Sequence, residues 1–104
     1  MSLVTNVIII VDTPLDDVDI PKGLLGELPF AARRDLEKFS RMDDEQAGGY
    51  KALEVDIFAC AFNYVIDYDF IIQWFHNLEW REGDDALLII SPQDGGFMLE
   101  RHMP

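Results

Sequence analysis

The chain has 104 residues, and its 20 Asp and Glu against eight Lys and Arg give a formal net charge of −12 at pH 7. A hydrophobic fraction of 49% and a charged fraction of 27% are those of an ordinary globular protein, which argues against disorder. So negative a chain repels phosphate groups, which argues against nucleic acid and anionic membranes and favours basic proteins or cations as partners. At this length we expect residues 1–104 to form a single acidic α+β domain.

The run from Val4 to Val11 is almost continuously apolar and rich in β-branched residues. Such a run predicts a strand that is covered on both faces, and therefore a central strand. Two prolines and three aspartates follow within residues 14–22, a composition typical of a surface loop.

Apolar residues then recur every three or four positions between Leu25 and Met42, which predicts the buried stripe of a helix. Pro29 lacks an N–H donor and fits an α-helix only where the helix begins. We therefore expect a short turn over residues 23–28 and a helix from about Pro29 to Met42. Gly48 and Gly49 then interrupt the chain.

Between Lys51 and Val65 the sequence alternates at first and then becomes apolar on both faces, which predicts a long strand that enters the core. In the alternating part, Val55 and Ile57 share one face, and Asp56 is expected on the opposite, solvated face.

The next helix has the clearest pattern, with apolar residues at helical spacing from Phe70 to Leu78. Asp67 or Asp69 is expected to cap its first turn, and Gly83 to lie near its C-terminal end.

The last two elements form a predicted β-hairpin. Residues 86–90 are a compact apolar strand, residues 91–96 contain Pro92 and two glycines, and residues 97–102 are expected to pair antiparallel. The predicted order is β-α-β-α-β-β. We expect an α+β fold, with a mixed α/β arrangement as the alternative, in which two helices pack on a mixed sheet of about four strands.

Carboxylates gather in the first loop, where Asp12, Asp16, Asp17 and Asp19 offer the hard oxygen ligands that Ca²⁺ or Mg²⁺ prefers. The spacing does not match an EF-hand loop, so these four are weak candidates for a metal site. A solvated acidic loop and a docking surface for a basic partner are the other interpretations.

Aromatic residues flank the second predicted helix. Trp80 falls off its buried stripe, and Tyr68 lies at its entrance. Exposed aromatics beside carboxylates are typical of interface hot spots. The predicted partner-binding residues are therefore Asp16, Asp17, Asp19, Tyr68 and Trp80.

The sequence shows no constellation of catalytic residues and no cofactor motif, so we expect no cofactor and favour a non-enzymatic role. The leading hypothesis is a protein-binding or inhibitor module that presents carboxylates and aromatics to a basic partner. A homo-oligomeric structural or regulatory subunit is the first alternative, and a small metal-dependent enzyme that uses the Asp12–Asp19 aspartates is the second. The lone Cys60 forms no internal disulfide, and no stretch resembles a secretory signal or membrane span, so we expect a cytoplasmic protein.

Overall fold

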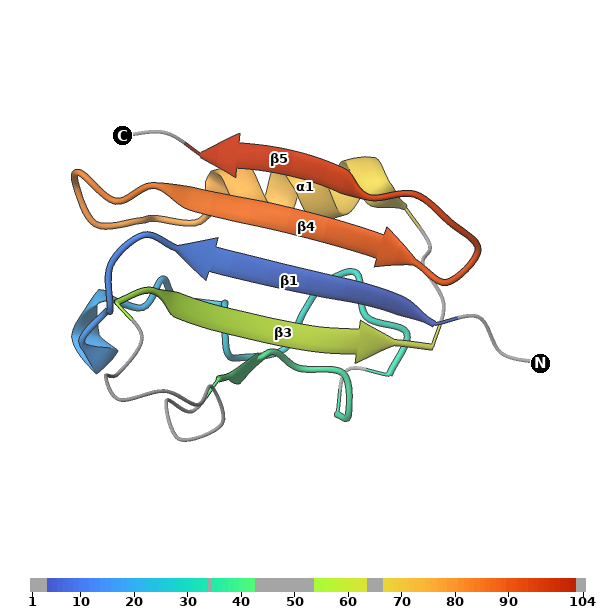
Figure 1. Ribbon diagram of the computed structural model, residues 1–104. Helices are drawn as coiled ribbons and strands as arrows, with labels where there is room; N and C mark the ends of the chain where they lie inside the picture. The colour runs from blue at the N-terminus through green and yellow to red at the C-terminus, as the bar shows by residue number, and fades with distance from the viewer. Residues whose placement is uncertain (1–3, 34, 43–53, 64–66, 103–104) are drawn as a thin grey trace.

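The computed structural model describes residues 4–33, 35–42, 54–63 and 67–102. Within these residues the chain forms one five-stranded antiparallel sheet in the order β2-β3-β1-β4-β5, with a single α-helix behind it (Figure 1). The strands are β1 (Thr5–Val11), β2 (Ser40–Arg41), β3 (Asp56–Phe62), β4 (Ala86–Pro92) and β5 (Met98–His102). The helix is α1 (Tyr68–Asn77), and a 3-10 helix, η1 (Asp17–Asp19), lies in the loop after β1.

β1 is the central strand, as its apolar run predicts. Ile9 lies opposite Phe58 of β3 on one side and opposite Leu88 of β4 on the other. β5 pairs with β4 through a hairpin, which confirms the predicted antiparallel partner of the 86–90 strand. Gly95 and Gly96 of the hairpin turn both have positive φ, a conformation that glycine adopts without steric cost.

The core lies on one face of the sheet, between the strands and two covering elements. α1 covers β4 and β5 and buries Ile71 and Phe75 (Figure 1). The irregular segment between β1 and β2 buries Leu24, Leu28, Phe30 and Phe39. The two covers meet in an aromatic contact, in which Trp74 of α1 stacks on Phe39 with ring centroids 5.7 Å apart.

Asp67 begins α1 as its N-cap, which confirms one of the two predicted caps. Its side chain accepts a hydrogen bond from the backbone N–H of Phe70 at 3.2 Å. The helix ends at Asn77, and Gly83 lies six residues further on, in a separate turn with φ +89°. The prediction that Gly83 closes the helix is therefore wrong.

The predicted four-stranded mixed sheet with two helices is also wrong, because the described residues contain five strands, all antiparallel, and one α-helix. The predicted helix from Pro29 to Met42 is replaced by isolated turns and the short strand β2. Leu36 of its apolar stripe is 67% exposed, whereas Glu37 beside it is buried. The Glu37 carboxylate accepts hydrogen bonds from the backbone N–H groups of Arg33 at 2.7 Å and Asn63 at 2.9 Å, which fixes the irregular course of this segment.

The strand predicted between Lys51 and Val65 is β3, whose seven residues start at Asp56; residues 51–53 and 64–65 lie outside the described part. Asp56 is buried rather than solvated, because it points into the core side of the sheet toward Arg41. None of the described helices is long and apolar enough to cross a membrane.

Candidate functional site

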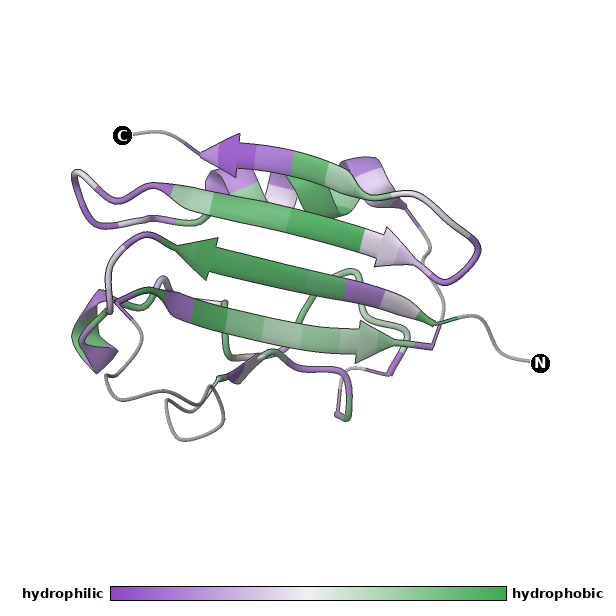
Figure 2. Cartoon of the chain, viewed as in Figure 1, coloured by the Kyte–Doolittle hydropathy of each residue, from purple (hydrophilic) through white to green (hydrophobic). Residues whose placement is uncertain are grey.

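The face of the sheet opposite α1 carries no other element of the described chain (Figure 1). The three central strands are hydrophobic along most of their length (Figure 2), so this face is apolar at its centre as well. Strand register arranges its side chains in two rows. One row runs through Ala59, Ile8, Ile89 and Leu99, and the other through Ile57, Ile10, Leu87 and Arg101. We call the seven apolar members of these rows the open face.

Polar residues bound the open face at both ends of the strands. At one end Asn6 and Ser91 lie in a row with the small residue Ala61, and Asp12 and Asp85 lie at the other end. An antiparallel sheet with one solvated face normally alternates apolar and polar residues, so that polar side chains meet water. Here both faces of the three central strands are apolar, whereas α1 and the irregular segment between β1 and β2 cover only one of these faces. Among the described residues, the predicted cover of β1 is therefore present on one face only.

Exposure along the open face increases toward its β5 edge. Ile8, Ile10 and Ile89 are half-buried by their neighbours in the sheet, while Leu99 is 62% exposed. Phe97, two residues before Leu99, is 75% exposed. Phe97 lies directly before β5, at the hairpin end of the sheet.

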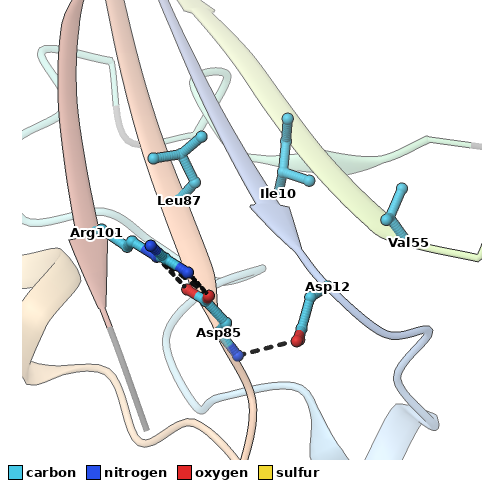
Figure 3. A pocket seen from close by; sticks show the side chains of 6 residues that line it. All are labelled: Ile10, Asp12, Val55, Asp85, Leu87 and Arg101. Atoms are coloured by element: carbon cyan, nitrogen blue, oxygen red, sulfur yellow. Dashed lines mark hydrogen bonds and ion pairs between the residues drawn. The ribbon is translucent and has the colours of Figure 1, made fainter.

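A hollow of about 410 Å³ lies at the opposite end of the open face (Figure 3). The side chains that line it are Ile10, Asp12, Val55, Asp85, Leu87 and Arg101. Three of these are apolar and come from the open face or its margin, and the other three form a charged rim.

The charges of this rim are bonded to one another. The Arg101 guanidinium donates two hydrogen bonds to Asp85 from Nε, at 3.0 and 3.1 Å, and a third from its NH2 group. These bonds hold the pKa of Asp85 below its ordinary value of 3.8 and raise the pKa of Arg101. The Asp12 carboxylate accepts a hydrogen bond from the backbone N–H of Asp85 at 3.0 Å (Figure 3). The rim is thus a set of internally satisfied polar groups around an apolar floor.

The aspartates of the first loop are engaged by two arginines from distant parts of the chain. Arg41 forms an ion pair with Asp17 at 3.1 Å, and Arg81 forms one with Asp19 at 3.3 Å. Asp16 is exposed and precedes η1 without a side-chain capping bond. The structure therefore brings Asp16, Asp17 and Asp19 together in one turn, with two of the three carboxylates already paired.

Asp12 does not join this group, since it bonds to Asp85 at the rim of the hollow. In the described part of the chain, no three His, Cys, Asp or Glu side chains converge in a way that could hold a metal ion. The weak metal candidates Asp12, Asp16, Asp17 and Asp19 are thus divided between two sites.

The two predicted aromatic contact residues lie near opposite ends of α1. Tyr68 is the first residue of the helix and Trp80 follows its end, and a ten-residue helix spans about 15 Å. Both are half-buried and pack against the core, Trp80 with its ring centroid 6.0 Å from that of Phe75. Trp80 directly precedes Arg81, whose guanidinium pairs with Asp19.

We did not predict the open face from the sequence, although the residue pattern that produces it is present. Ile8 and Ile10 in β1, like Leu87 and Ile89 in β4, make both faces of these strands apolar. The same pattern arises when a second layer covers the sheet, so it indicates burial without saying what provides it.

In comparisons with known proteins, the chain matches no family model, and no curated protein or solved structure is detectably similar to it.

Proposed function

We propose that this protein is a non-enzymatic protein-binding module and that the open face of its sheet is the contact surface. The observation that carries the proposal is the apolar centre of a sheet face that the described chain leaves uncovered. Contiguous exposed apolar patches rimmed by polar residues mark protein–protein contact sites. The open face has this composition, with an apolar centre and polar residues at both strand ends.

Two further features support a binding role. Six of the seven residues of the open face lie on the three longest strands, so the surface is held by paired backbone on both sides. The half-buried Cys60 thiol has a pKa raised to about 11, mainly by burial, and so is not a ready nucleophile near neutral pH.

The acidic turn at Asp16, Asp17 and Asp19 gives the proposal a second contact region. With a net charge of −12, the chain attracts basic proteins at long range and speeds their encounter. We place the protein in the cytoplasm and exclude nucleic acid as a partner on the sequence grounds given above. In this division of roles, charge steers a basic partner and the open face supplies the buried contact.

Capture from a cell extract tests this function when the bait is compared with matched variants. Ile8→Thr with Leu99→Thr makes the open face more polar but keeps β-favouring side chains. Leu36→Thr is the control, because Leu36 is 67% exposed and lies between β1 and β2, outside both the open face and the acidic turn. We expect the native chain and the control to retain the same protein and the double variant to lose it. Equal retention by all three baits contradicts the proposal.

A further inference from the structure

We infer that the hollow receives the side chain of a lysine of the partner protein and that the lysine ammonium group pairs with Asp12. This inference rests on the proposed function and deepens it, since it names the group on a basic partner that the hollow recognises. Three features of the hollow support it: the apolar floor, the net charge of the rim, and one carboxylate oxygen that accepts no hydrogen bond from the described residues.

The floor of the hollow suits a flexible aliphatic chain. Ile10 of β1 lies opposite Leu87 of β4, and Val55 directly precedes β3, so three branched apolar side chains from neighbouring parts of the sheet form the floor (Figure 3). The volume of about 410 Å³ lies within the roughly 300–1,000 Å³ range of sites for small organic groups. A lysine side chain lays its methylene groups on apolar surface and keeps its ammonium group at a polar margin. The hollow offers both surfaces side by side.

The charges of the rim leave one negative charge uncancelled. Arg101 donates three hydrogen bonds to Asp85, which lower the pKa of Asp85 and raise the pKa of Arg101, so the two groups stay charged and neutralise each other near neutral pH. Asp12 is the remaining charged residue of the rim, and its hydrogen bond comes from a neutral backbone N–H. The rim therefore attracts a cation, in keeping with the net charge of −12 of the whole chain.

The hydrogen bonds of the rim favour lysine over arginine as the source of that cation. Asp12 Oδ1 accepts from the Asp85 N–H at 3.0 Å, while Oδ2 accepts no hydrogen bond from the described residues. Both carboxylate oxygens of Asp85 already accept from Arg101. Arginine binds a carboxylate best through two parallel bonds to its two oxygens, whereas the lysine ammonium is a compact charge that one oxygen can hold. One open oxygen thus suits an ammonium group.

Nuclear magnetic resonance of the isotope-labelled chain tests the hollow directly. The probe is n-butylammonium, which is the side chain of lysine without its backbone. We expect saturable shifts of the amide signals of Asp85 and Leu87, and a Kd at least about threefold lower than that of 1-butanol, an uncharged probe of the same length. The arginine probe n-propylguanidinium should bind more weakly than n-butylammonium. Shifts spread evenly over the chain, equal Kd values for butanol and butylammonium, or tighter binding of the guanidinium overturns the inference.

Two variants that each remove one negative charge separate the role of Asp12 from that of net charge. In Asp12→Asn the side-chain amide oxygen can still accept from the Asp85 N–H. Asp94→Asn is the matched control, because Asp94 is exposed in the turn after β4, at the other end of that strand from the hollow. We expect Asp12→Asn to bring the two Kd values within about twofold of each other and Asp94→Asn to leave their ratio unchanged. Equal effects of the two variants contradict the pairing with Asp12.

The capture experiment distinguishes failure of this inference from failure of the proposed function. We expect the Asp12→Asn bait to retain less of the captured protein than the Asp94→Asn bait. If the probe experiment fails but the bait with Ile8→Thr and Leu99→Thr still loses the protein, only this inference fails. If that bait retains the protein as well as the native chain does, the proposed function fails with it.

Discussion

Arg41 joins the loop after β1 to the sheet through three neighbours. Its Nε donates to Asp56 Oδ1 at 2.9 Å, its NH2 group donates to Asp56 Oδ2 at 2.5 Å and to the Leu15 carbonyl, and its NH1 group pairs with Asp17 at 3.1 Å. Asp56 also accepts from the backbone N–H of Leu15 at 3.0 Å. The Asp56 side chain is only 6% exposed, so its charge depends on this guanidinium for compensation.

We predict that Arg41→Met destabilises the fold by about 2 kcal/mol, less than the roughly 3–5 kcal/mol of a fully buried pair because Arg41 is a third exposed. Urea unfolding at one fixed protein concentration measures the change. Asp17→Asn is the matched control, since the Asp17 side chain is 94% exposed and bonds the same arginine. The control should lie within about 0.5 kcal/mol of the native chain. Equal losses in the two variants would show that burial of Asp56 is not the source of the effect.

Among the described elements, α1 is the one regular cover of the sheet, and its first turn depends on Asp67. The capping bond from Phe70 N satisfies a backbone donor that has no partner within the helix. The buried side chains of Ile71 and Phe75 follow directly, so fraying of this turn would loosen their packing.

We predict that Asp67→Ala lowers the free energy of unfolding by about 1 kcal/mol. Thermal or urea unfolding followed by circular dichroism checks the value. Gln73→Ala, at an exposed position in the middle of α1, should be neutral or slightly stabilising, since alanine is the better helix former. A loss in the Gln73 variant as large as in the Asp67 variant would contradict the capping role.

The elements that could be predicted are those whose signals are local. α1 combines a cap at Asp67 with apolar residues at helical spacing, and the β4–β5 hairpin combines two strand patterns with Gly95 and Gly96. In both elements the local sequence pattern favours the same structure as the tertiary contacts, so the sequence predicts the observed structure there.

The segment before β2 could not be predicted, because its structure depends on distant residues. The buried Glu37 carboxylate accepts a hydrogen bond from the backbone N–H of Asn63, 26 positions away. The Arg41 side chain donates to Asp56, 15 positions away. The apolar spacing from Leu25 to Met42 is genuine, but its members cover the sheet irregularly and leave Leu36 exposed. In this segment tertiary contacts outweigh the local helical pattern.

The candidate site shows the same limit. The acidic turn at Asp16, Asp17 and Asp19 was visible in the sequence, but its pairing with Arg41 and Arg81 was not. The open face needed the strand order and the number of covering elements, neither of which a strand pattern contains.

For the whole molecule, charge and apolar surface have separate positions. The acidic turn lies in the loop after β1, and the open face lies on the uncovered side of the sheet. A contact made by charge weakens as salt rises, because ions screen exposed charges. A contact made by the apolar open face should persist as salt rises, because it does not depend on exposed charges. The salt dependence therefore tells which surface dominates an observed association.

Cross-linking inside the source cell tests most directly whether the open face contacts a protein. A photoreactive residue at position 99, where Leu99 is 62% exposed on the open face, is compared with one at position 36, where Leu36 is 67% exposed in the segment between β1 and β2. Our account predicts a discrete protein adduct at position 99 and none of that mass at position 36. The absence of an adduct at position 99, or the same adducts at both positions, would contradict the open face as the contact surface.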